Sequence, residues 1–132
     1  MAEHLLEVRN VCKSFPGVKA LDHVDLTIDY GEVHGLIGEN GAGKSTIIKI
    51  IAGIYTPDEG TVTFNGKECE NESIREALSR GISVIYQELC LVPHMKVYEN
   101  IVLGYEGGRH GAYSAQAARA RAAQILEQLG LD

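Results

Sequence analysis

Apolar and polar side chains alternate along residues 6–11 and again, more regularly, along residues 24–28. An alternation with a period of two predicts β-strands that are buried on one face. Pro16-Gly17 lies between the two stretches and has the residue types of a tight turn. A further β-rich stretch, residues 61–64, runs into Asn65-Gly66, a pair typical of two-residue hairpins. The front of the chain is therefore predicted to be rich in antiparallel β-structure.

Two short stretches, residues 33–37 and 82–86, are mainly apolar without regular alternation, which favours strands buried on both faces. Ser73 with Glu76 three residues later predicts a capping box at a helix start, and Gly130 is placed to end the last helix. Helices are expected over residues 46–54, 73–80, 98–103 and 114–129. The apolar face of the last one consists of Ala115, Ala118, Ala122, Ile125, Leu126 and Leu129. Buried strands that alternate with helices behind an antiparallel region predict an α/β fold with a β-rich flank.

Composition and charge exclude several classes of protein. The 132 residues are 45% hydrophobic and carry a net charge of −6, so a core can form and the length indicates one domain or part of one. An acidic balance without a basic run argues against a nucleic-acid partner. The cysteines form no CxxC pair and the histidines show no paired spacing, so neither a disulfide framework nor a metal site is predicted. We expect no signal peptide and no membrane-spanning segment.

The strongest chemical signal is a glycine-rich loop between a predicted strand and a predicted helix. It reads Gly38-Glu39-Asn40-Gly41-Ala42-Gly43-Lys44-Ser45-Thr46 and matches G-x-x-x-x-G-K-[ST]. Glycines let a backbone wrap closely around an anion, and the helix start adds the positive end of its dipole. In such a loop Lys44 reaches the β- and γ-phosphates and the Ser45 hydroxyl is a ligand for Mg²⁺. The loop predicts a nucleoside-triphosphate site rather than an ordinary glycine-rich turn.

The loop alone does not choose among nucleotide-binding proteins, because many NTPases and kinases share it. Taken by itself, Phe15 at a strand end is typical of a core aromatic. Gln87 after a short strand is typical of a solvated loop residue. His34 is expected to be a satisfied residue of a buried strand, and the carboxylates of Asp58-Glu59 are read as turn and surface charges.

Three segments in order point to a family: residues 14–21 before the loop, the loop itself, and residues 85–89 after it. Together they resemble the ATP-binding subunits of ABC transporters, in particular those of bacterial monosaccharide importers of the ribose/galactose/xylose type. The resemblance implies a P-loop NTPase core with an antiparallel β subdomain, in an α/β fold. It places the β-rich flank at about 1–31 and 61–66, the P-loop core at 32–56 and 81–88, and the start of a helical subdomain at about 89–132.

The resemblance also implies roles for single residues. Phe15 stands where the family places an aromatic ring that stacks on adenine. Gln87 matches the glutamine that contacts Mg²⁺ and the attacking water, so it joins Lys44 as an expected catalytic residue. Residues 90–104 would contribute to the surface that docks on a membrane subunit. The implied cofactors are ATP and Mg²⁺.

Some elements of the family's hydrolytic site have no counterpart in the sequence. The chain contains no LSGGQ-type loop, no apolar strand that ends in Asp-Glu, and no later switch histidine; Leu78-Ser79-Arg80-Gly81 precedes Gln87 and lacks paired glycines. The chain is therefore expected to be the front portion of an ABC domain, inactive as an ATPase by itself. The alternatives are a nucleotide-binding or assembly module without turnover, and a small P-loop kinase.

In an intact family member, ATP binding and hydrolysis would drive monosaccharide uptake. The resemblance implies membrane permease subunits, a second ATP-binding domain and, indirectly, a sugar-binding protein as partners. It implies a peripheral location on the cytoplasmic face of the bacterial inner membrane.

Overall fold

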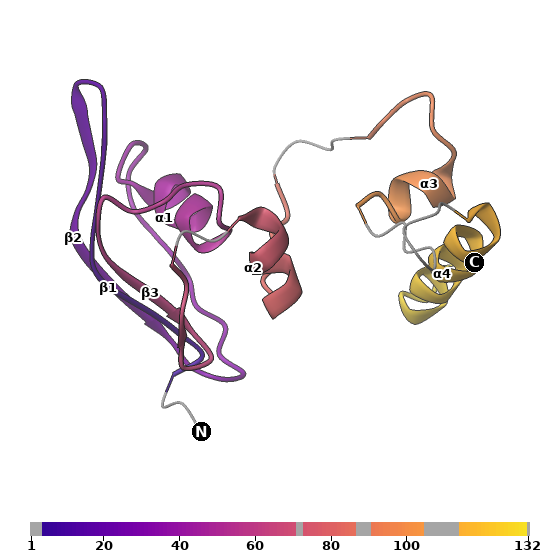
Figure 1. Ribbon diagram of the computed structural model, residues 1–132, viewed down its shortest axis with the longest axis horizontal. Coiled ribbons are helices and arrows are strands. Elements are labelled where there is room, and N and C mark those ends of the chain that lie inside the picture. Colours follow the sequence, from indigo (N-terminus) through magenta and orange to yellow (C-terminus); the bar gives the residue numbers. More distant parts are fainter. Residues whose placement is uncertain (1–3, 71–72, 87–90, 105–113, 132) are drawn as a thin grey trace. The chain divides into compact units, whose positions relative to one another are not determined.

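The computed structural model describes residues 4–70, 73–86, 91–104 and 114–131. The chain divides into two compact units, Met1–Ile85 and Tyr86–Asp132 (Figure 1). Among the described residues, the first unit holds a four-stranded sheet and two helices, and the second holds two helices. Within the described part of the chain, no helix is both long and apolar enough to cross a membrane.

The sheet of the first unit is antiparallel, with strand order β2-β1-β3-β4. Its strands are β1 (Leu6–Phe15), β2 (Val18–Ile28), β3 (Glu59–Phe64) and β4 (Lys67–Glu68). Pro16 and Gly17 form the turn between β1 and β2, and Asn65 (φ 50°) and Gly66 (φ 73°) form the turn between β3 and β4. Positive φ at both central residues is the conformation of a type I′ turn. Both predicted turns are confirmed.

The pairing of β1 is interrupted near its middle. Its register shifts against β2 between Val8 and Val11, and against β3 between Arg9 and Cys12. Asn10 lies there with φ 53°, and Gly60 of β3 has φ 86°. A side chain at Gly60 would place its Cβ 2.4 Å from the Asn10 carbonyl oxygen. Glycine is therefore required where β3 crosses this bulge.

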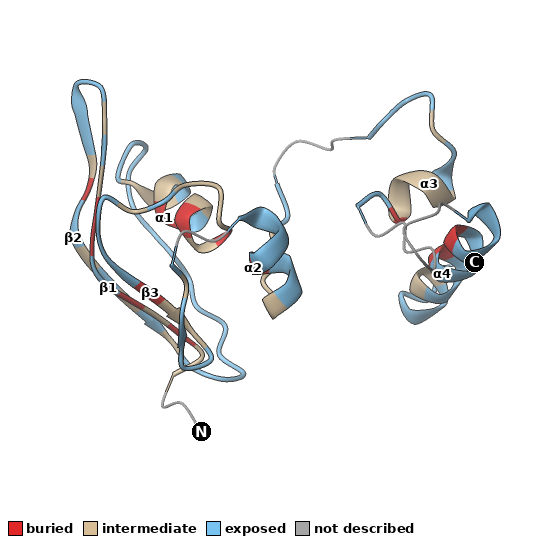
Figure 2. Cartoon of the chain, in the orientation of Figure 1, coloured by how far each residue is buried: buried red, intermediate tan, exposed pale blue. Residues whose placement is uncertain are grey.

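Helix α1 (Lys44–Ile51) packs its apolar side against the sheet (Figure 1). Ile47 and Ile50 are its buried residues, which are spaced for one helix face. The buried core that they share with the three long strands consists of Leu6, Val8, Val11, Leu21, Ile47, Ile50 and Val62 (Figure 2). This packing fixes the start of α1, and with it the glycine-rich loop, relative to β1 and β2.

Helix α2 (Ile74–Arg80) confirms the predicted capping box. The Ser73 hydroxyl accepts a hydrogen bond from the Glu76 amide, and the Glu76 carboxylate accepts one from the Ser73 amide at 2.7 Å. The helix ends at Gly81, whose φ of 98° suits glycine. All of these contacts are local, which is why the residue pattern predicts them.

The second unit consists of α3 (Val97–Ile101) and α4 (Ala115–Gln128). Val102, Ala118 and Ala122 are its buried residues, with Tyr98 and Ile101 packed against them. Ser114 caps α4 by accepting a hydrogen bond from the Ala117 amide.

The end of α4 and its apolar face follow the prediction in part. Gly130 has φ 67° and ends the helix as predicted. The predicted face of α4 is only partly covered, because Ala115 and Leu129 are exposed within this unit.

The two strands predicted to be buried on both faces are not formed, and those predictions are wrong for this structure. Residues 33–37 and 82–86 have no strand pairing. Val33 is 99% exposed, Ile37 96% and Ile85 98%. A strand buried on both faces needs ladder partners and covering layers, and among the described residues neither segment has them. His34 accordingly lies on an exposed stretch and not on a buried strand.

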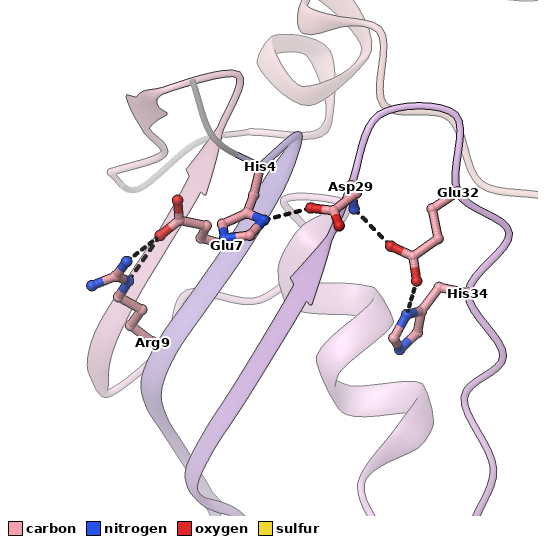
Figure 3. Close-up of polar contacts among 6 residues, drawn as sticks. All are labelled: His4, Glu7, Arg9, Asp29, Glu32 and His34. Carbon is pink, nitrogen blue, oxygen red and sulfur yellow. Dashed lines mark hydrogen bonds and ion pairs between the residues drawn. The ribbon is translucent and has the colours of Figure 1, made fainter. Parts of the chain in front are cut away.

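Polar contacts join the end of β2 to the segment that follows it (Figure 3). The Glu32 carboxylate accepts a hydrogen bond from the Asp29 amide at 2.7 Å and contacts Nδ1 of His34 at 2.8 Å. These contacts hold the pKa of the Glu32 carboxyl below its ordinary value. On the other side of β2, the Asp29 carboxylate contacts Nδ1 of His4. The chain that leaves β2 toward the glycine-rich loop is thus fixed at its start.

Candidate nucleotide-binding site

The glycine-rich loop leads directly into α1. Gly43 caps the helix with φ 86°, and its carbonyl oxygen accepts hydrogen bonds from the amides of Thr46 and Ile47, both at 3.0 Å. A turn precedes it, in which the Ala42 amide donates to the Glu39 carbonyl oxygen at 3.2 Å. Amides in the first turn of a helix have no acceptor within the helix, and the helix dipole makes this end positive. The loop therefore presents donors suited to an anion.

Lys44 places its positive charge inside this loop. Its ammonium donates hydrogen bonds to the carbonyl oxygens of Gly38 and Glu39, both at 2.6 Å. A Cβ at Gly38 would lie 3.3 Å from Ala42 Cβ and 3.9 Å from the Lys44 ammonium. The loop is thus a close cradle with a lysine across it, which fits a phosphate group. Ser45 follows on the exposed first turn of the helix and offers the hard oxygen that Mg²⁺ prefers.

Gly43 also fixes the loop against the sheet. A Cβ at this position would lie 2.6 Å from the carbonyl oxygen of Ala20 and 2.7 Å from Leu21 Cδ2, both on β2. Gly41 has a similar φ of 87°, but a Cβ there would meet nothing within 4 Å. The two glycines therefore have different roles: Gly41 allows the loop to turn, and Gly43 allows it to pack closely on β2.

Phe15 is half-buried at the end of β1. Its ring meets the ring of Tyr55 edge to face, with 5.3 Å between centroids. Tyr55 in turn has the Lys49 ammonium 5.4 Å from its ring centroid. Because Lys49 belongs to α1, these ring contacts connect Phe15 with the helix that the phosphate loop opens.

Asp58 holds the end of β1 in place, a role that the residue pattern does not predict. Its carboxylate accepts hydrogen bonds from the Lys13 ammonium and the Ser14 amide, each at 2.6 Å. The Lys13 side chain and the Ser14 amide hold the pKa of the Asp58 carboxyl below its ordinary value. Asp58 is thus more than a turn residue, because it fixes the two residues before Phe15. No local signal could reveal this, since the partners lie 44 and 45 residues away in the chain.

The structure brings the predicted loop residues, Gly38 to Thr46, together at one end of α1, and connects Phe15 to the same helix. Gln87 lies outside the described residues. The expected docking segment is described from Leu91 to Gly104. There Leu91, Val92, Val97 and Ile101 contribute to a mainly apolar hollow of about 440 Å³, which Asn100 also lines.

Comparisons with known proteins identify the family of the chain. The model of the ABC transporter family matches residues 21–132. The arabinose import ATP-binding protein AraG of Azospirillum brasilense is 50% identical over 126 residues, which are 96% of this chain and 24% of that protein. The ribose import ATP-binding protein RbsA 1 of Rubrobacter xylanophilus is 51% identical over 96% of this chain and 26% of its own length. The chain thus spans about a quarter of the length of these relatives.

Solved structures of ATP-binding cassettes resemble this chain in fold. The ATP-binding cassette MJ1267 of an ABC transporter superimposes with a TM-score of 0.81 at 32% identity, over 98% of this chain and 55% of that one. A dimeric post-hydrolysis state of the cassette MJ0796, bound to ADP and Pi, gives a TM-score of 0.74 at 28% identity, over 96% of this chain and 58% of that one. With the family match over residues 21–132, these likenesses show that the chain belongs to the ABC transporter family and has the fold of its ATP-binding cassettes.

Proposed function

We propose that this chain is the nucleotide-binding N-terminal part of the ATP-binding protein of a bacterial monosaccharide importer. The observation that carries the proposal is the position of the Lys44 ammonium, within 2.6 Å of two carbonyl oxygens of a glycine loop that opens a helix. The names of the relatives supply the biological setting, because they are import ATP-binding proteins for arabinose and ribose. The cargo class of this chain follows from those names and not from its own site.

In this proposal the loop from Gly38 to Thr46 holds the triphosphate of ATP. Lys44 contacts the β- and γ-phosphates, and the Ser45 hydroxyl and Gln87 are ligands of Mg²⁺. Bound Mg²⁺ would neutralise phosphate charge during hydrolysis. Phe15 stacks on the adenine ring, so β1 and the phosphate loop grip opposite ends of the nucleotide. Lys44 and Gln87 are the residues that we assign to catalysis in the intact protein.

The proposal extends to partners and domain organisation. Residues 1–31 and 61–66 form the β-rich flank, residues 32–56 and 81–88 belong to the P-loop core, and residues 89–132 begin a helical subdomain. The apolar hollow beside Leu91 and Ile101 is the surface that we assign to a membrane permease subunit. A second ATP-binding domain completes the site, and a sugar-binding protein delivers cargo. In this proposal the protein lies on the cytoplasmic face of the inner membrane.

The test is calorimetric titration of the chain with Mg-ATP, together with two lysine variants. Lys44→Ala removes the ammonium from the phosphate loop, and Lys67→Ala removes the same charge from the exposed strand β4. Charge-assisted hydrogen bonds contribute about 1.5–3 kcal/mol, so Lys44→Ala should weaken binding by about tenfold or more. Lys67→Ala should bind ATP nearly as the unmodified chain does.

Equal losses in the two variants would mean that only overall positive charge matters, which would refute a specific site. Failure of a chain that is folded by circular dichroism to bind Mg-ATP would also refute nucleotide binding by this part alone.

A further inference from the structure

Three potential metal ligands meet where the pairing of β1 is interrupted, away from the glycine-rich loop in the sequence. Cys12 lies on β1, His23 on β2, and Glu59 is the first residue of β3. The thiol, an imidazole nitrogen and a carboxylate oxygen all lie within 4.8 Å of one another. We propose that these three side chains form a zinc-binding site that joins the three strands.

The geometry of the sulfur–nitrogen pair already matches coordinated zinc. Cys12 Sγ lies 3.5 Å from Nδ1 of His23. With Zn–S near 2.3 Å and Zn–N near 2.0–2.1 Å, a tetrahedral angle places the two ligand atoms about 3.6 Å apart. Glu59 stands directly across the strand pair from Cys12 in the β1–β3 register. Its carboxylate is exposed and offers an oxygen as the third ligand.

The donor set favours zinc over the hard cations. A thiolate and an imidazole are ligands that zinc binds strongly, whereas Mg²⁺ and Ca²⁺ prefer oxygen. Three protein ligands leave a fourth tetrahedral position, which water fills in open zinc sites. Asn10 Oδ1 contacts Nδ1 of His23 at 2.9 Å, and a bound zinc ion would replace this contact.

Neighbouring groups also hold the imidazole and the thiol in place. The other ring nitrogen of His23, Nε2, lies 3.5 Å from the carboxylate of Asp22. A carboxylate near the ring nitrogen that does not face the metal is an arrangement that orients many zinc-bound histidines. The backbone amide of His23 donates to Cys12 Sγ at 3.2 Å, which stabilises negative charge on the sulfur.

The backbone around the cluster is held in uncommon conformations. His23 has φ 48° and Asn10 has φ 53°, both in the left-handed region that residues other than glycine seldom adopt. Asn10 is fixed by the bond from its amide to the Asp25 carboxylate at 2.7 Å. In a regular pair of strands, successive side chains point to alternate faces of the sheet. The bulge interrupts this alternation and turns His23 toward Cys12. Cys12, His23 and Glu59 come from separate strands, so their spacing in the sequence carries no metal signal.

The test uses the full chain with Cys69→Ser and Cys90→Ser, so that Cys12 is the single thiol. Co²⁺ is the probe, because a cobalt–thiolate bond gives a charge-transfer band in the near ultraviolet and a tetrahedral site gives visible d–d bands. Both bands should appear at one equivalent of Co²⁺ and disappear when Zn²⁺ is added. Cys12→Ser should abolish the charge-transfer band. His23→Asn and Glu59→Gln should each weaken Co²⁺ binding at least about tenfold, because loss of a group that only supports a ligand already costs about that much. His34→Asn, which removes an exposed imidazole elsewhere in the unit, should change nothing.

Absence of a charge-transfer band in a chain that is folded by circular dichroism would overturn the proposal. So would a band that persists in Cys12→Ser, or equal binding in His23→Asn and His34→Asn. If Cys12→Ser does not fold, because Cys12 is buried in the sheet, the two exposed variants, His23→Asn and Glu59→Gln, decide the question. The outcome is independent of ATP binding, since no ligand of the proposed zinc site belongs to the phosphate loop.

Discussion

The ring of Phe15 meets the ring of Tyr55 edge to face, with 5.3 Å between centroids and 65° between planes. Edge-to-face contact uses the rim of one ring and one face of the other, so neither ring is enclosed on both faces by this contact. Phe15 is only half-buried, so it is neither a fully enclosed core residue nor a free surface ring. The contact with Tyr55 positions Phe15 beside α1. The proposed nucleotide site requires an aromatic ring there to stack on adenine.

Phe15→Ala should weaken ATP binding by about 1–3 kcal/mol, or roughly five- to hundredfold in Kd, because base–aromatic stacking contributes that much. The measurement is a titration with a fluorescent ATP analogue. Phe64→Leu is the matched control, since Phe64 packs against the core of the same sheet, and it should leave the Kd nearly unchanged. Phe15→Tyr should restore most of the affinity. An unchanged Kd in Phe15→Ala would mean that Phe15 only packs against its neighbours and does not contact adenine.

Gly43→Ala should destabilise the first unit much more than Gly41→Ala. Both glycines have φ near 87°, and a side chain in the left-handed region costs roughly 1–2 kcal/mol. Only at Gly43 does the new Cβ also collide with β2, 2.6 Å from the Ala20 carbonyl oxygen, which adds about 1–3 kcal/mol. Urea unfolding followed by circular dichroism measures the difference. Equal unfolding free energies for the two variants would show that the loop does not pack on β2 as described.

The residue pattern predicts those elements whose contacts are local. The Ser73–Glu76 capping box and the turn at Asn65-Gly66 depend on residues three positions apart or fewer, and both are found in the structure. The phosphate loop is predicted for the same reason. Strand formation over residues 33–37 depends on partners elsewhere, so an apolar run is not enough, and the prediction of a buried strand there is wrong.

Contacts between distant residues are also what the pattern misses at the site. Asp58 anchors Lys13 and Ser14 across more than 40 residues of sequence. Cys12, His23 and Glu59 meet only because β1, β2 and β3 pair with a bulge. Neither group of residues has a characteristic spacing in the sequence. Periodicity shows which residues share a face of one helix or strand, but not which residues of different strands meet.

Asp58→Asn should lower the stability of the chain at pH 7 and weaken ATP binding, because it loosens the strand end that carries Phe15. The Lys13 side chain and the Ser14 amide lower the pKa of this carboxyl in the folded chain. A lowered pKa stabilises the fold above the ordinary Asp value of about 3.9, and this contribution is lost as pH falls through the folded-state pKa.

The urea midpoints of the parent chain and of Asp58→Asn should therefore differ at pH 7 and converge as the pH is lowered below about 4. Glu70→Gln, which alters an exposed carboxylate near β4, is the control and should shift neither the midpoint nor ATP affinity. If the urea midpoints of the parent and of Asp58→Asn differed by the same amount at every pH, the effect would come from the shape of the side chain and not from its charge.

ATP turnover by the 132-residue chain alone should remain at background even where Mg-ATP binds. The sequence contains the phosphate loop but neither an LSGGQ-type loop nor an apolar strand ending in Asp-Glu, so the groups that would complete the site and orient the attacking water are not in this chain. Phosphate release should therefore be as slow in the unmodified chain as in Lys44→Ala, although only the unmodified chain is expected to bind ATP tightly. Sustained release that Lys44→Ala abolishes would instead mean that Lys44 and its neighbours suffice for hydrolysis. In that case the chain would have to be assigned its own general base and would no longer be a binding part of a larger ATPase.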